Sequence, residues 1–230
     1  MAPRRMSEKR NNVKIKAGEF IIRPSESERL LGIRVHQSML WNEHIRDAEG
    51  SVIKQLTTRV NGLRKLTNRA DFMTKLMIAN GIIMSKLSYG LCMWGNCQGY
   101  LRKALQVTQL NAARAVCGYR SYYWSTKRLL KTCNWLSVNQ LYWQQVLMTT
   151  HKILSSGRPV NIHSRMVAKH QHGTRSASGV SRGFGNLAMT PSFNFSALQY
   201  NKLPAKMRET TSLASFKQQL RTWVEQNINV

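Results

Sequence analysis

Two aspartates and eight glutamates are the residues of this sequence that could hold metal ions for phosphoryl transfer. That chemistry needs clustered carboxylates, because paired Mg²⁺ ions are held by oxygen ligands. Asp47 and Asp71 lie far apart in the sequence, and no two acidic residues are adjacent. The sequence therefore predicts no catalytic residue and no metal site.

Basic residues greatly outnumber these acids. The 230 residues include 35 Lys and Arg against 10 Asp and Glu, which gives a formal net charge of +25 at pH 7. No acidic residue lies between Phe72 and Arg208. A soluble surface normally mixes both signs, so this span favours RNA or DNA as a partner over a basic surface kept for solubility alone. No membrane partner is expected, since no stretch joins a strongly apolar face to a dense basic one.

Basic side chains spread along the chain are the candidate contacts for phosphate groups. Such contacts give affinity with little base preference. The predicted nucleic-acid-binding residues are Lys54, Lys65, Arg69, Lys75, Arg114, Arg120, Arg175 and Arg182. Lys54, Lys65 and Arg69 fall opposite an apolar helical stripe, and an ordinary solvent-exposed face explains that pattern equally well.

Three consecutive aromatic residues form a second kind of candidate contact. Tyr122, Tyr123 and Trp124 stand beside Arg120 and Lys127 and are candidates for stacking on single-stranded bases. Packing against neighbouring helices is the alternative, and the sequence alone favours it.

The cysteines predict a reducing compartment. Cys92, Cys97, Cys117 and Cys133 have a spacing that fits neither a zinc knuckle nor a zinc ribbon. Three of them sit among apolar residues, so we expect buried, reduced thiols. The chain opens with a polar and basic stretch instead of a signal peptide. We expect a cytoplasmic or nuclear protein that is not secreted.

The elements that would position these residues are mainly helical, with a small β element at the start. A hairpin is expected over 13–23 and a third strand over 30–35, with Gly32 inside it. Expected helices cover about 42–68 with a break near Gly50, then 71–89, 100–116, 125–132, 137–154 and 213–223. The predicted class is mainly α with an N-terminal β element, that is, α+β.

The expected domain organisation follows from these elements. It comprises a basic disordered start over 1–12, a β element over 13–40, a helical region over 41–155, a basic Gly/Ser-rich loop segment over 156–192 and a helical extension over 193–230.

Six stretches in a fixed order carry a resemblance to a known family. They are LLGIRVHQSMLWNEHI, SKLSYGLCMWG, LQVTQLNAARAVCGYR, LLKTCNWLSVNQLYWQQ, HGTRSA and YNKLPAKMRETTSLASFKQQLRTW. Together they resemble the C-terminal part of the reverse transcriptases of non-LTR (LINE-type) retrotransposons. The resemblance implies that the β element ends the palm, that the following helices are the thumb and its C-terminal extension, and that Leu31 and Gly32 take a primer-grip-like position. Leu30 departs from the family's usual aromatic residue, and Tyr200 from its frequent tryptophan.

The resemblance implies a primer–template hybrid of RNA and DNA as the partner, together with the upstream part of the polymerase. The family's aromatic-x-Asp-Asp turn, which binds Mg²⁺, has no counterpart, because no Asp-Asp pair occurs. We therefore interpret the chain as a non-catalytic fragment of an RNA-directed DNA polymerase, without a cofactor of its own. Two alternatives stay open: a stand-alone basic RNA- or DNA-binding protein derived from a retrotransposon, and a decayed remnant without function.

We expect this chain alone to add no deoxynucleotide to a primer–template, because losing the metal-binding carboxylates removes phosphoryl-transfer chemistry. A primer-extension assay with Mg²⁺ measures this against a reaction without protein. Extension above that background would contradict the prediction.

Overall fold

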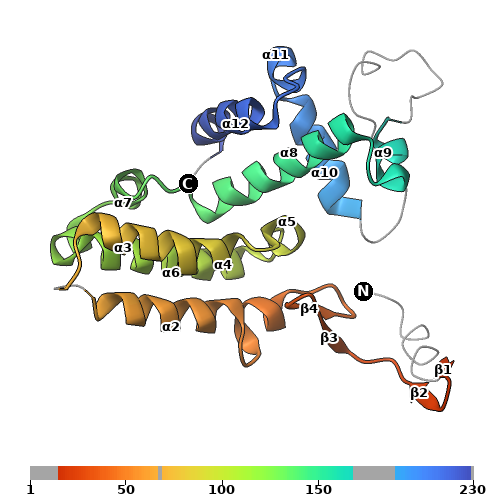
Figure 1. Ribbon diagram of the computed structural model, residues 1–230, viewed down its shortest axis with the longest axis horizontal. Helices are drawn as coiled ribbons and strands as arrows, with labels where there is room; N and C mark the ends of the chain where they lie inside the picture. The colour runs from red at the N-terminus through yellow and green to blue at the C-terminus, as the bar shows by residue number, and fades with distance from the viewer. Residues whose placement is uncertain (1–14, 67–68, 168–189, 229–230) are drawn as a thin grey trace. The chain divides into compact units, whose positions relative to one another are not determined.

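The computed structural model describes residues 15–66, 69–167 and 190–228 (Figure 1). The described chain is mainly helical with a small antiparallel β element at its start, which confirms the coarse fold class. It divides into two compact units. The first unit comprises Met1–Gly90 and Cys97–Val116, and the second comprises Leu91–Asn96 and Cys117–Val230. The helical region expected over 41–155 thus contributes to both units.

The first unit begins with two antiparallel hairpins. Strand β1 (Ile15–Ala17) pairs with β2 (Phe20–Ile22), as the sequence predicts. The next two strands, β3 (Ser27–Leu30) and β4 (Ile33–His36), pair so that Leu30 lies opposite Ile33.

The continuous strand expected over 30–35 is therefore wrong. Leu31 has φ of 49° and Gly32 has φ of 79°, so these two residues form the turn of the second hairpin. Positive φ at both central positions is what a type I′ turn requires. Gly32 therefore lies in the turn that reverses the chain direction, and it does not form a bulge within a strand.

The helical elements of the first unit correspond to the helical stretches that the sequence predicts. They are η1 (Glu43–Asp47), α2 (Val52–Arg64), α3 (Phe72–Ala79), η2 (Asn80–Met84), α4 (Ser85–Ser88) and α6 (Gly99–Cys117), of which the last residue belongs to the second unit. Gly50, with φ of 69°, separates η1 from α2 at the expected break. The Asp71 carboxylate accepts a hydrogen bond of 3.1 Å from the Thr74 amide, which caps α3.

The core of the first unit is aliphatic. Helix α2 buries Leu56, Val60 and Leu63, and it contacts the continuous run formed by α3, η2 and α4. Ile83 and Leu87 on that run are fully buried.

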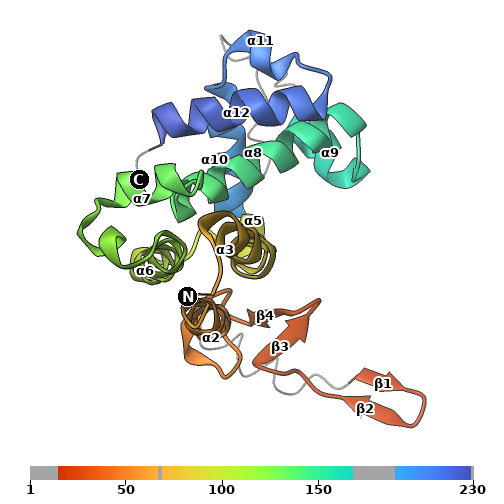
Figure 2. The same ribbon diagram turned by 60° about the vertical axis from the view of Figure 1, so that its left-hand side comes forward.

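The second unit is built around one long helix. Its elements are α5 (Leu91–Trp94), η3 (Tyr119–Tyr123), α7 (Thr126–Thr132), α8 (Val138–Ser156), α9 (Val160–Val167), α10 (Thr190–Asn201), α11 (Ala205–Arg208) and α12 (Leu213–Asn227). Helix α8 contacts α5, α9, α10 and α12, and Figure 2 shows α12 running beside it. A capping box between Ser137 and Gln140 starts α8, and Gly157 with φ of 67° ends it.

An aromatic stack joins α8 to the C-terminal helices. The imidazole of His151 stacks on Phe216 with ring centroids 3.7 Å apart, and its Nδ1 lies 2.8 Å from the Tyr200 hydroxyl. Around this stack the buried residues Leu147 and Leu220 complete an apolar cluster. Burial of this cluster stabilises the second unit.

The loop expected over 156–192 is partly wrong. Residues 160–167 form α9, and α10 begins at Thr190. The rest of that segment, like the expected basic start over 1–12, lies outside the described residues.

Gly95 yields a packing prediction. An added Cβ would overlap the ring of Tyr142 and the carbonyl of Leu91, so Gly95→Ala should lower the unfolding free energy of the second unit by about 1–3 kcal/mol. Chemical denaturation with circular dichroism measures this.

Gly62→Ala is the matched control for this substitution. Gly62 lies in α2 with open space around it, and an alanine there should stabilise its helix by up to about 1 kcal/mol. Equal stability of the Gly95→Ala variant and the wild type would contradict the packing around Gly95.

Candidate nucleic-acid interface

The solvent-facing side of α2 carries predicted phosphate contacts. Leu56 and Leu63 face the core, whereas Lys54 and Lys65 are exposed, and Arg69 is exposed just beyond the helix. The ammonium of Lys54 donates a hydrogen bond of 3.4 Å to the Asp47 carbonyl oxygen, not to a carboxylate. The positive charge of this face is therefore left for a ligand to neutralise.

The other predicted basic contacts divide into three groups. Lys75 is only 7% exposed, so its burial argues against a phosphate contact, and we remove it from the interface. Arg114 is half-buried and donates to the Asn111 side-chain oxygen at 3.3 Å. Arg175, Arg182 and the side chain of Arg120 lie outside the described residues.

Leu31 and Gly32 sit at an exposed hairpin tip. Leu31 is 81% exposed, and its carbonyl oxygen accepts a hydrogen bond of 2.7 Å from the Tyr89 hydroxyl. A Cβ built on Gly32 would lie 4.0 Å from the Tyr89 ring. Tyr89 at the end of α4 is thus the close neighbour of this tip, and the primer-grip-like role of Leu31 and Gly32 stays a prediction.

A buried histidine lies among cations beside this tip. Burial, followed by the charges of Lys86, Arg29 and Arg34, lowers the pKa of His44 to about 4. The neutral imidazole accepts a hydrogen bond of 3.2 Å at Nδ1 from the Arg34 amide. Glu43 lies 3.9 Å from the Arg34 guanidinium and moderates the local positive charge.

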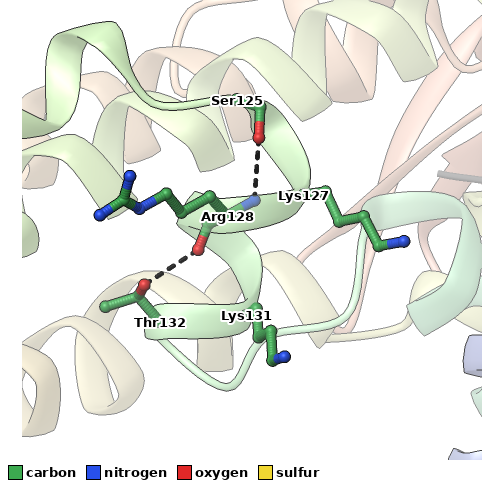
Figure 3. A pocket seen from close by; sticks show the side chains of 5 residues that line it. All are labelled: Ser125, Lys127, Arg128, Lys131 and Thr132. Atoms are coloured by element: carbon green, nitrogen blue, oxygen red, sulfur yellow. Dashed lines mark hydrogen bonds between the residues drawn. The ribbon is translucent and has the colours of Figure 1, made fainter.

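Helix α7 of the second unit presents a basic hollow of about 530 Å³. It is lined by Ser125, Lys127, Arg128, Lys131 and Thr132 (Figure 3). Ser125 caps the helix by accepting a hydrogen bond from the Arg128 amide at 3.3 Å, and the Thr132 hydroxyl donates to the Arg128 carbonyl at 2.9 Å. Figure 3 shows the side chains of Lys127 and Lys131 pointing in different directions from that of Arg128, although all three line the hollow.

The aromatic residues before α7 differ in exposure. Tyr122 is 54% exposed and Tyr123 is 87% exposed, so packing between helices does not account for them. Trp124 is half-buried, and the Arg128 guanidinium lies 4.3 Å from its ring centroid. The packing alternative therefore describes Trp124 and is wrong for Tyr123.

Sequence reasoning missed Lys131 as an interface residue. A usable signal was present, because a serine cap at Ser125 followed by Lys127 and Lys131 places both lysines on one helical face. The sequence does not show that these lysines and the neighbouring Tyr123 are all exposed, because exposure depends on tertiary packing.

The described acidic residues do not fit a catalytic Mg²⁺ ion. Asp47 accepts a hydrogen bond of 2.8 Å from Arg46, and Asp71 caps α3. No group of three or more described His, Cys, Asp or Glu side chains is placed to bind a metal ion.

None of the four cysteines forms a disulfide in the part of the chain that the structure describes. Cys97 and Cys133 are buried as expected, whereas Cys92 and Cys117 are half-buried. The sulfur atoms of Cys117 and Cys133 lie 3.7 Å apart and share a hydrogen bond. This hydrogen bond and burial raise the pKa of Cys133, so its thiol stays protonated. Within the described residues, no helix has the length and apolar character needed to cross a bilayer.

No protein-family model, curated protein or solved structure matches the chain.

His44 yields a pH prediction. Its folded-state pKa of about 4 lies below the ordinary 6.5, so its contribution to stability is complete above pH 6.5 and is lost as the pH falls toward 4. Relative to His44→Gln, the wild type should lose about 3 kcal/mol of unfolding free energy between pH 7 and pH 4.

NMR titration of the His44 ring protons measures the same property directly. An ordinary pKa near 6.5 for His44 would contradict its described environment.

Proposed function

We propose that the chain binds the sugar–phosphate backbone of a primer–template hybrid, as the palm end, thumb and C-terminal extension of a non-LTR retrotransposon reverse transcriptase. The order of the family-like sequence stretches supports this reading. The observation that carries it is the solvent-facing side of α2, where Lys54, Lys65 and Arg69 are exposed and no carboxylate contact is described for them.

Phosphate binding by this face follows from elementary electrostatics. Each phosphate that a lysine or arginine neutralises releases condensed counterions, which makes the affinity fall steeply with salt. Because these side chains contact no base edges in such a mode, base sequence should matter little. The chain thus supplies affinity and position, and catalysis belongs to a region with metal-binding carboxylates.

A stand-alone RNA- or DNA-binding protein derived from a retrotransposon is the second candidate function. The observation that favours it is the exposure of Tyr123, because a duplex offers no free base face to an exposed ring. Both candidates share salt-dependent binding, and they differ in whether single strands bind independently of a duplex.

Charge removal from α2 tests the proposal. We expect Lys54→Gln/Lys65→Gln/Arg69→Gln to weaken binding of an RNA–DNA hybrid at least about tenfold at low salt. The slope of log affinity against log salt should shrink by about 2 to 3, since up to three phosphate contacts are lost. Fluorescence anisotropy with a labelled hybrid measures both quantities.

A variant with the same charge change on the second unit is the control. Lys152, Lys202 and Lys217 are exposed there, and changing all three to Gln should leave the salt slope nearly unchanged. Equal losses in the two variants would show that net charge, and not the α2 face, determines binding. Wild-type binding that does not respond to salt would overturn the proposal itself.

A further inference from the structure

We propose that the surface around α7 is a binding site for single-stranded nucleic acid, in which Tyr123 stacks on a base while Lys127 and Lys131 bind phosphates. We call Tyr123, Lys127 and Lys131, with the hollow-lining Ser125 and Thr132, the α7 site. The inference rests on the proposed nucleic-acid binding and names a second ligand class for it.

A rigid turn holds the tyrosine out from the surface. Gly118 has φ of 83°, and its carbonyl oxygen accepts hydrogen bonds from the amide (3.1 Å) and hydroxyl (2.5 Å) of fully buried Ser121. The Trp124 amide donates in turn to the Ser121 carbonyl at 3.1 Å. Tyr123 lies between these anchored residues with 87% of its surface exposed, so its ring is accessible to a base, and a tyrosine with only two χ angles orders at low entropic cost.

Trp124 is not the stacking surface of this site. The guanidinium of Arg128 lies over its ring at 4.3 Å and already occupies one face. This pair instead engages the Arg128 guanidinium, and Figure 3 shows the side chains of Lys127 and Lys131 pointing in other directions. The most exposed ring beside α7 is that of Tyr123, and it is the one we assign to the stacked base.

The two lysines lie within reach of a strand whose base stacks on Tyr123. Lys127 and Lys131 are four residues apart on α7, a spacing that puts their Cβ atoms about 5–6 Å from each other. Tyr123 precedes Lys127 by four residues, so their Cα atoms are at most about 14 Å apart. A stacking ring beside a short row of cations is the arrangement that binds single strands with little sequence preference.

No acidic residue of the second unit lies in this part of the chain. Its acids are Glu209 and Glu225, and Glu225 pairs with Arg221 at 3.1 Å. Among the described residues, no carboxylate forms an ion pair with Lys127 or Lys131, so their charge is available to a polyanion. Duplex DNA or RNA could use that charge, but its stacked bases leave Tyr123 without a partner, so the site favours unpaired strands.

Anisotropy with two labelled 12-mers tests the proposal without any mutation. One probe is oligo(dT), and the other is an abasic strand with the same phosphates. We expect the wild-type full chain to bind the abasic strand about tenfold more weakly, which equals the loss of one stacked base. Equal affinities for the two probes would overturn the proposal.

Variants then locate the contact. Tyr123→Ala should weaken oligo(dT) binding about tenfold and leave the abasic probe and the RNA–DNA hybrid within twofold, whereas Tyr123→Phe keeps a ring and should bind like the wild type. Lys127→Gln/Lys131→Gln should weaken both single-stranded probes, and the charge-matched Lys152→Gln/Lys217→Gln should not. Unchanged oligo(dT) binding by Tyr123→Ala, or equal losses in the two lysine variants, would overturn the α7 site.

The hybrid probe separates this proposal from the proposed function. If the wild type binds the hybrid but Tyr123→Ala does not change oligo(dT) binding, the α7 site is overturned and the proposed function is not. Absence of salt-dependent binding to every probe overturns both.

Discussion

Uncompensated positive charge is the constraint to which the rest of this structure responds. With no acidic residue from Phe72 to Arg208, carboxylates cannot neutralise the basic side chains of that span. The described cations instead interact with uncharged groups that carry partial negative charge. Arg102 donates to the Cys97 carbonyl at 3.2 Å, and Arg128 lies over the ring of Trp124. Such contacts orient a guanidinium but leave its net charge in place, so the surface stays attractive to a polyanion.

The same constraint means that apolar packing, not ion pairing, must hold each unit together. In the second unit the interior is formed by Leu147, Phe216 and Leu220, each fully buried and each worth about 1.5–3 kcal/mol of transfer free energy. Buried Ser137, Gln140 and His151 in this unit each make a side-chain hydrogen bond. Burial lowers the pKa of His151, and its neutral ring lies 2.8 Å from the Tyr200 hydroxyl. His44 follows the same rule in the first unit.

Local signals in the sequence predicted much of the fold. Capping side chains at Asp71, Ser125 and Ser137 each begin a helix in the structure, because a short polar side chain satisfies amides that the first turn leaves unpaired. Gly32 was misplaced for an equally local reason. The alternation of Leu31 with the following apolar residues fits a strand, and the turn puts Leu31 itself at positive φ, which leucine seldom adopts.

The candidate interface was less predictable, because exposure depends on tertiary packing. Helical spacing correctly placed Lys54 on the outer side of α2, but nothing local distinguished it from Lys75, which is buried. Likewise the three aromatic residues before α7 look alike in sequence. The structure separates them, since Arg128 covers Trp124 while Tyr123 extends into solvent.

The central claim is that exposed cations on α2 bind the nucleic-acid backbone. Lysine footprinting tests it most directly: the full chain is acetylated with and without a saturating RNA–DNA hybrid, and each lysine is quantified by mass spectrometry. The account predicts protection of Lys54 and Lys65, with exposed Lys152 and Lys217 modified equally in both samples. Unchanged modification of Lys54 and Lys65 while the hybrid is bound would contradict it.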